Sequence, residues 1–399
     1  MYNTKKITED LFYIGSDDYR LTLFENIHPI QKGVSYNSYL LLDEKTVLLD
    51  TLDWSKGEEF LSKIEKVLNG KTLDYIVIHH MEPDHGAMIG EVLLRYPQVK
   101  VVASKQAFVF MKQFGFSLNE ENMLVVKEGD KVSFGKHELA FVGAPMVHWP
   151  EALVSFDTTT GTLFSADAFG SFGTLFGRLY DDEFDIEKEL LDEMRRYYTN
   201  IVGKFGMPVQ TLLKKASGLD IKMICPLHGP IWRTNLGLLL DKYNKWSSYE
   251  AEEKGILMVY ASMYGNTERA AATLASKLVE KGAKKVVVYD VSKTDVSTLI
   301  SETFKYSHLV LASPTYNAGV FPLMHNYLED MKALSVQNKT VGIIENGTWA
   351  CKAGDEMIKA LVEMKNMTVL EERVKILSSM NEKNEEEMDK LAEALVKSL

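Results

Sequence analysis

The segment 79–85 (HHMEPDH) concentrates side chains that bind divalent metal ions. It directly follows the apolar run Asp74–Ile78, so we expect it at the end of a strand, where one loop can direct several side chains to one point. Imidazoles and carboxylates are the usual protein ligands of such ions, and Pro83 stiffens the loop. The predicted ligands within this segment are His80, Glu82, Asp84 and His85.

Three residues further along the chain could complete this site: His148 in APMVHWPEA, Asp167 in FSADAFG and His228 in CPLHGP. Each follows a strand-like run, and each is flanked by glycine, proline or small residues. Taken alone, a histidine is more often a hydrogen-bonded structural residue, and an aspartate in a turn usually serves the turn. Together with the segment 79–85, they predict a metal site on strand-end loops at one edge of a sheet.

The spacing resembles the H-x-H-x-D-H motif and the downstream His, Asp and His of the metallo-β-lactamase fold, with Glu82 in place of the second histidine. The site then combines carboxylates with four imidazoles, a harder ligand set that suits iron better than zinc. Two ferrous ions carry four positive charges. The carboxylates of Glu82, Asp84 and Asp167 with one bridging hydroxide would neutralise them.

The pattern H-x-E-x-D-H, followed by His, Asp and His, is similar to that of the flavodiiron family in particular. The resemblance implies that His80, Glu82 and His148 bind one iron, that Asp84, His85 and His228 bind the other, and that Asp167 bridges them. His79 has no counterpart among those ligands, so we expect it to be structural or to support a ligand.

The segment 261–267 (ASMYGNT) lies between a predicted strand and a predicted helix. Hydroxyl, amide and backbone N–H groups at a helix N-terminus bind a phosphate dianion. The nucleoside triphosphate and dinucleotide glycine motifs are absent. Two further loops, 313–319 (SPTYNAG) and 345–349 (ENGTW), follow later strands, and loops at the carboxyl ends of parallel strands form a ligand crevice.

This half of the chain resembles flavodoxin over its whole length. The resemblance implies that the FMN phosphate is held by Ser262, Met263, Tyr264, Gly265, Asn266 and Thr267. It also implies that the flavin ring is flanked by Pro314, Thr315, Tyr316, Asn317, Gly319, Asn346, Gly347 and Trp349.

The elements that must position these residues change character along the chain. In the first part, strand-like runs are separated by short turns, as in hairpins, and a few helical patterns interrupt them near 56–68, 87–96, 105–114 and 185–202. This arrangement predicts two sheets covered by helices. We expect an αββα metallo-β-lactamase-like sandwich over residues 1–250. After the polar segment Trp246–Gly255, strands and helices alternate regularly, which predicts a doubly wound parallel sheet of flavodoxin type over residues 251–399.

Composition excludes several classes of function. A net charge of -11 argues against a nucleic-acid binder. No apolar run reaches the roughly 20 residues that span a bilayer, and the start of the chain lacks a signal-peptide pattern, so we expect a soluble cytoplasmic protein. Cys225 and Cys351 form no C-x-x-C pair, so the chain carries no rubredoxin-like iron site, and the family resemblance implies a separate rubredoxin-like electron donor.

The resulting hypothesis is a flavodiiron oxidoreductase that reduces O2 to water, NO to N2O, or both, with electrons relayed through FMN. Two ferrous ions and reduced FMN together supply the four electrons that O2 requires. The resemblance further implies a head-to-tail homodimer or a dimer of such dimers. It also implies that Tyr197 donates a proton or hydrogen bond in the substrate pocket, where Glu25 replaces a histidine of some relatives and His28 lies nearby.

Two other functions remain open at this point. A dizinc hydrolase of the metallo-β-lactamase fold could be fused to a flavodoxin module, although Glu82 and the electron balance argue against it. A plain electron carrier would use only the flavodoxin half, which would leave the metal ligands without a role.

Overall fold

The computed structural model describes residues 3–399 and divides into two compact units. The first unit runs to Tyr198 and includes Met207–Tyr243, while the second comprises Thr199–Gly206 and Asn244–Leu399. The predicted sandwich and the predicted doubly wound sheet are both present, so the fold class is confirmed. The division at residues 250 and 251 stays a prediction.

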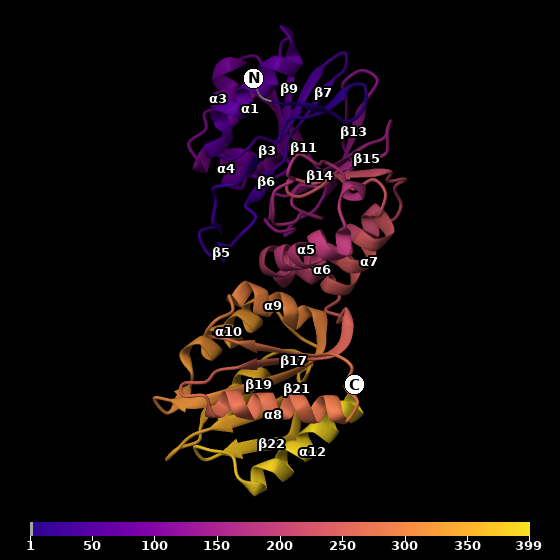
Figure 1. The fold of residues 1–399 in the computed structure, drawn as a ribbon. Helices are drawn as coiled ribbons and strands as arrows, with labels where there is room; N and C mark the ends of the chain where they lie inside the picture. Colours follow the sequence, from indigo (N-terminus) through magenta and orange to yellow (C-terminus); the bar gives the residue numbers. More distant parts are fainter. Residues whose placement is uncertain (1–2) are drawn as a thin grey trace. The chain divides into compact units, whose positions relative to one another are not determined.

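Two main sheets form the first unit (Figure 1). In sheet order, the seven-stranded sheet consists of β1 (Lys5–Lys6), β2 (Leu11–Tyr13), β7 (Tyr39–Leu42), β8 (Thr46–Leu49), β9 (Tyr75–Val77), β10 (Lys100–Ser104) and β11 (Met123–Val126). The five-stranded sheet consists of β12 (Lys131–Ser133), β13 (Glu138–Gly143), β14 (Leu153–Asp157), β15 (Thr162–Phe164) and β16 (Met223–Cys225). Short two-stranded pairs join β3 (Ser16–Asp18) to β6 (Val34–Tyr36) and β4 (Leu23–Phe24) to β5 (His28–Pro29).

Strand direction in the larger sheet differs from what hairpin-like spacing favours. The antiparallel pairing holds for β7 with β8 and for β12 to β15, but β8, β9, β10 and β11 run parallel. The helices α1 (Gly57–Leu68), α3 (Ile89–Arg95) and α4 (Lys105–Gln113) lie between successive parallel strands in the sequence. Parallel strands need such crossovers. The consequence is that β9 ends, and the segment 79–85 begins, at the same sheet edge as β8.

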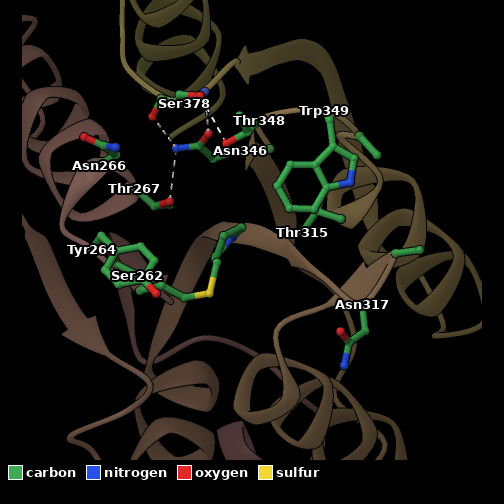
Figure 2. Close-up of a pocket in the computed structure, with 15 residues that line it drawn as sticks. Ser262, Tyr264, Asn266, Thr267, Thr315, Asn317, Asn346, Thr348, Trp349 and Ser378 are labelled. Atoms are coloured by element: carbon green, nitrogen blue, oxygen red, sulfur yellow. Dashed lines mark hydrogen bonds between the residues drawn. The ribbon is translucent and has the colours of Figure 1, made fainter.

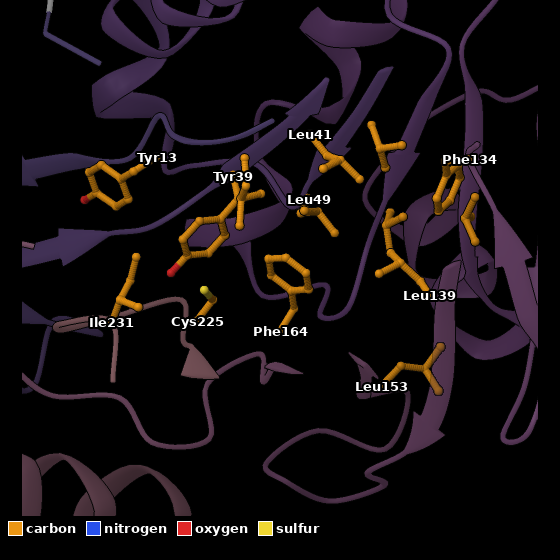
Figure 3. Close-up of a cluster of buried hydrophobic side chains, with 14 of the residues drawn as sticks. Tyr13, Tyr39, Leu41, Leu49, Phe134, Leu139, Leu153, Phe164, Cys225 and Ile231 are labelled. Atoms are coloured by element: carbon orange, nitrogen blue, oxygen red, sulfur yellow. The ribbon is translucent and has the colours of Figure 1, made fainter. Parts of the chain in front are cut away.

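The core of this unit lies between the two sheets (Figure 3). Alternate residues of β7 and β8 point into it, among them Tyr39, Leu41 and Leu49, and side chains of the other sheet such as Phe164 pack against them. The Tyr39 hydroxyl donates to the backbone oxygen of Pro226 at 2.7 Å. Packing at crystal-like density resists displacement, so the loops at the strand ends keep fixed positions.

The helix predicted over 185–202 is interrupted by π-helical turns. The segment consists of a π-turn at Ile186–Leu190, α5 (Leu191–Tyr197) and a second π-turn at Tyr198–Val202. Tyr197 therefore stands directly before a break in the helical ladder, a feature frequent at functional sites. Two further helices, α6 (Gly206–Ala216) and α7 (Leu236–Ser247), were not predicted from the sequence.

The second unit is a parallel sheet with helices on both faces (Figure 1). In sheet order its strands are β18 (Val286–Asp290), β17 (Glu253–Tyr260), β19 (Tyr306–Tyr316), β21 (Thr340–Asn346) and β22 (Thr368–Ile376), and β20 (Gly319–Val320) pairs with β19. Its helices are α8 (Asn266–Glu280), α9 (Val296–Lys305), α10 (Pro322–Ala333), α11 (Ala353–Val362) and α12 (Glu382–Ser398). Helices α8 and α12 bury their apolar faces against one side of the sheet.

A buried histidine ties the two sheets of the first unit together and makes the unit's stability depend on pH. The imidazole of His137 lies between Asp157, at 2.7 Å, and Asp10, at 2.9 Å. The hydrogen bond to Asp157 outweighs burial and, with Asp10, raises the pKa of His137 to about 9. Because the folded state favours the proton, the stabilisation is complete below the unfolded-state pKa of about 6.5 and is lost as pH rises through about 9.

We therefore expect the wild-type protein to lose about 1–2 kcal/mol more stability than a His137→Gln variant between pH 6.5 and 9.5, a figure reduced from the full shift for solvent screening. Urea unfolding midpoints at the two pH values measure this difference. Parallel losses in the two proteins would mean that His137 is not charged in the folded state.

Candidate metal centre and ligand pocket

The predicted metal ligands converge in the first unit from four strand ends. Glu82 caps a helical turn, α2 (Pro83–Gly86), that carries Asp84 and His85, so the predicted loop is partly helical. The side chains form two groups, and within each group the potential ligand atoms all lie within 4.8 Å of one another. One group is His80, Glu82, His148 and Asp167, and the other is Asp84, His85 and His228.

Asp167 stands between the two groups. Its Oδ2 lies 3.4 Å from Nε2 of His80 and 3.3 Å from Nε2 of His148. Its Oδ1 lies 3.0 Å from Nε2 of His85 and 3.7 Å from Nε2 of His228. One carboxylate oxygen thus faces each group, which is the geometry of a bridging ligand.

The buried polar atoms of this cluster fit two metal ions. Among residues 3–399, neither carboxylate oxygen of Asp84 or Asp167 has a hydrogen-bond donor, although all four are buried. The Nε2 atoms of His85 and His228 are 3.1 Å apart, a distance that two lone pairs tolerate only with a cation or proton between them. Ligand atoms at right angles on an ion with bonds of about 2.1 Å are about 3 Å apart. The observed spacing matches this value.

The balance of charges within the cluster also favours bound cations. Burial opposes charge on these groups, but the carboxylates around His85 and His148 raise the pKa of each imidazole to about 9. Burial likewise acts against ionisation of Asp167, yet His85 and the other imidazoles hold its pKa well below the usual range. The buried carboxylates therefore favour positive charge close to them. Metal cations would supply that charge, and imidazoles bind such ions in their deprotonated form.

Groups behind the ligands fix which imidazole nitrogen faces the centre. Nδ1 of His80 donates to Oε1 of Glu151 at 2.9 Å, and Nδ1 of His228 donates to the backbone oxygen of Ser35 at 2.8 Å. Each hydrogen bond selects the tautomer whose Nε2 lone pair points into the site. Neither Glu151 nor Ser35 was predicted from the sequence, although Glu151 lies in the WPEA segment that follows His148.

His79 lies outside the ligand groups. Its Nδ1 donates to Asp50 at 2.5 Å and its Nε2 accepts from Ser155 at 2.7 Å. All three residues are buried, so a substrate could not reach the serine and the arrangement is structural. It anchors the segment after β9, in which His80 follows directly.

Aromatic rings form one wall beside the centre. Phe24, Tyr36 and Tyr197 pack around the imidazole of His228 with ring centroids 5.4, 5.8 and 5.5 Å away. The Tyr197 hydroxyl is buried and has no hydrogen-bond partner among residues 3–399. Glu25 lies near Glu82: burial and the Glu82 charge raise the pKa of Glu25 to about 8. Nε2 of His28 is 3.8 Å from Glu25.

A pocket of about 320 Å³ opens in the second unit at the carboxyl ends of β17, β19, β21 and β22. Its volume falls in the range of small-molecule sites. Figure 2 shows the rings of Tyr264 and Trp349 on two sides of this pocket, and both are more than 90% exposed. At its base Asn346 donates to Thr267 at 3.4 Å and to the backbone oxygen of Ser378 at 3.1 Å.

Most residues predicted for the cofactor lie in the lining of this pocket. They are Ser262, Met263, Tyr264, Asn266, Thr267, Pro314, Thr315, Asn317, Asn346, Gly347 and Trp349. Gly265 shapes the first loop with φ 88° but is not in the lining. Tyr316 and Gly319 face a neighbouring groove instead. Ala318 and Thr348 also line the pocket and lie within the predicted loops 313–319 and 345–349, whereas Ala350 and Ser378 were not predicted. Ser378 follows the last strand, so the strand-end rule could have found it.

Comparison with known proteins identifies the family. The ODP family beta lactamase matches residues 34–229 and the flavodoxin family matches residues 258–393. A nitric oxide reductase from Moorella thermoacetica is 31% identical over 360 residues, which are 89% of this chain and 89% of that protein. The flavodiiron protein of Giardia intestinalis superposes with a TM-score of 0.92 at 25% identity, over 100% of this chain and 98% of that one. This chain belongs to the flavodiiron family.

A second solved structure supports the same assignment. The rubredoxin oxygen:oxidoreductase of Desulfovibrio gigas superposes on this flavodiiron chain with a TM-score of 0.92 at 26% identity, over 99% of this chain and 98% of that one. The flavodiiron chain is an oxidoreductase whose flavodoxin unit implies a flavin cofactor. Within residues 3–399, none of its helices has the length and apolar character needed to cross a bilayer.

Proposed function

We propose that this flavodiiron protein reduces NO to N2O and O2 to water at two iron ions, with electrons supplied through FMN. The position of Asp167, with one oxygen facing each ligand group, is the observation that carries the proposal. His80, Glu82 and His148 would hold one iron, and Asp84, His85 and His228 the other. When bound, the two ferrous ions supply an open coordination site for a diatomic molecule and electrons for its reduction.

The protein's own groups supply position and exclude water. The carboxylate of Asp167 would hold both ions, and the hydrogen bonds behind His80 and His228 fix the direction of their lone pairs. The wall of Phe24, Tyr36 and Tyr197 is mainly apolar. Such a wall favours small uncharged molecules such as NO and O2 over hydrated anions.

Tyr197 is proposed to donate a hydrogen bond to the bound substrate, because its hydroxyl is buried and unpartnered at this wall. A Tyr197→Phe variant is expected to keep its iron and flavin and to be at least as stable as wild type, since an unsatisfied buried hydroxyl is removed. Its turnover of NO or O2 should fall by about 100-fold, the low end of general-acid effects. Unchanged turnover would make Tyr197 a packing residue only.

The flavin pocket is proposed to bind FMN with its phosphate at the N-terminus of α8, where Ser262, Asn266 and Thr267 meet. A rubredoxin-like protein is proposed as the donor, as the family resemblance implies. A head-to-tail homodimer or a dimer of dimers, and a cytoplasmic location, stay predictions that follow from the family resemblance and the chain's composition.

The experiment that tests the function is elemental and flavin analysis of anaerobically purified protein, followed by turnover with NO and with O2. Two irons and one FMN per chain with turnover of either gas would support the proposal. NO comes first, because the relative that is 31% identical is named a nitric oxide reductase. Two zinc ions that persist after iron-replete expression would instead favour the dizinc hydrolase.

A further inference from the structure

Glu151 is a buried carboxylate placed directly behind a predicted metal ligand. Its side chain is 0% exposed, and Oε1 accepts both the Nδ1–H of His80 and the backbone N–H of Met81, each at 2.9 Å. The same oxygen therefore fixes the imidazole ring and the backbone next to it.

The backbone that carries Glu151 is held on both sides. Its carbonyl oxygen accepts from the hydroxyl of Ser104 at 3.0 Å, and Ser104 itself caps the N-terminus of α4. Two residues later, the N–H of Leu153 donates to the backbone oxygen of His79 at 3.0 Å. Because these bonds tie the segment to the strand end of β9, the Glu151 carboxylate cannot follow the imidazole if the latter moves.

The two metal positions differ in what lies behind their histidines. His80 has the carboxylate of Glu151, whereas His228 has the backbone carbonyl of Ser35. Nδ1 of His85 has no hydrogen-bond partner among residues 3–399. A carboxylate behind an imidazole raises the ligand's basicity more than a carbonyl does.

The second carboxylate oxygen of Glu151 indicates whether a positive charge should lie near this residue. Oε2 is buried and has no hydrogen-bond partner among the described residues. An ionised carboxylate with one oxygen unsatisfied is costly in a protein interior unless positive charge lies nearby. A metal ion bound at Nε2 of His80 would provide that charge through the imidazole.

We propose that Glu151 is a positioning residue that makes the metal position of His80, Glu82 and His148 electronically distinct from the other one. Its carboxylate holds His80 in the Nδ1–H tautomer and strengthens its bond to the metal. The inference rests on the proposed metal centre. It goes beyond that proposal because it assigns the two metal positions different affinities for iron and names the Glu151 carboxylate as the cause.

The test compares full-length wild type with Glu151→Gln, both loaded anaerobically with ⁵⁷Fe(II) and followed by Mössbauer spectroscopy during the iron titration. The glutamine keeps an acceptor of the same size in place but removes the charge. We expect one of the two ferrous sites to bind about 10- to 100-fold more weakly, the usual effect of losing such a supporting group. The other site should be unchanged.

Asp181→Asn is the matched control, because Asp181 is also a fully buried carboxylate but accepts hydrogen bonds from the loop at Arg233–Asn235. It should lower the melting temperature and leave both iron affinities as in wild type. If Glu151→Gln fails to fold, Glu151→Asp tests the position of the carboxylate instead of its charge, since it withdraws the acceptor from Nδ1 of His80 by one methylene; weaker iron binding at one site only is again expected.

The outcomes separate the two proposals. Wild-type protein that binds fewer than two irons would overturn the proposed function. Wild type with two irons, and a variant with unchanged or equally weakened sites, would overturn only the role of Glu151. Selective weakening of one site would support it.

Discussion

Replacing Asp167 by asparagine is expected to abolish reduction of NO and O2. Turnover should fall by more than about 100-fold, because losing a group that only supports a ligand already costs up to that much, and losing a ligand costs more. The iron content should fall from two ions per chain to one or fewer. Each carboxylate oxygen of Asp167 faces one ligand group. An amide supplies only one acceptor and directs an NH₂ group at the other position, where it repels a cation.

Iron analysis and turnover of the purified variant measure this effect, and circular dichroism verifies the fold. Asp182→Asn is the control, since Asp182 is partly exposed and pairs with Arg233. That variant should retain two irons and wild-type turnover. An Asp167→Asn protein with two irons would contradict the bridging role, even if its activity were low.

Local sequence could predict which ligand-type residues come together, because they obey a simple rule of chain geometry. Ligand-type residues follow strands, and strand ends of one sheet meet at one edge. His148 and Asp167 lie far from His80 in the sequence, yet the rule placed them together, and the structure brings their nitrogen and oxygen atoms within 3.4 Å. The family motif then supplied the pairing into two groups, which spacing alone does not determine.

Support behind the ligands could not be predicted in the same way. The carbonyl of Ser35 that orients His228 is a backbone atom, and any residue type supplies one. Glu151 has a side chain that can accept a hydrogen bond from a histidine, but the sequence does not show which imidazole nitrogen it contacts. Such contacts depend on how the two sheets pack, so they appear only with the tertiary structure.

Strand direction in the first unit and the interruptions of its helices were likewise not predictable from local sequence. The parallel run from β8 to β11 follows from crossover helices whose presence was predicted but whose topological role was not used. The π-turns on either side of α5 have no signature in hydrophobic periodicity. In the second unit, regular strand and helix alternation predicts a doubly wound parallel sheet, whose ligand loops lie at the carboxyl ends of its strands, so the strands and the pocket loops were predicted together.

A Ser262→Asp variant is expected to lose FMN, with an affinity more than about 100-fold below that of wild type. The Oγ of Ser262 accepts the N–H of Gly265 at 3.0 Å, at the point where α8 begins. An aspartate can accept the same hydrogen bond and suits a helix N-terminus, so the unit should stay folded. Its charge would face the phosphate dianion, and two like charges about 4 Å apart near a protein surface repel by several kcal/mol.

Flavin extraction and titration of the apoprotein with FMN, followed by fluorescence quenching, measure the loss. Ser276→Asp is the matched control, because it adds the same charge to an exposed position of the same helix, away from the pocket lining. Iron content should be unchanged in both variants, since every predicted iron ligand belongs to the first unit. Ser262→Asp protein that binds FMN as tightly as wild type would place the phosphate elsewhere in the pocket. The helix N-terminus would then be an ordinary capped loop, and the choice of FMN over a flavin without phosphate would lose its structural basis.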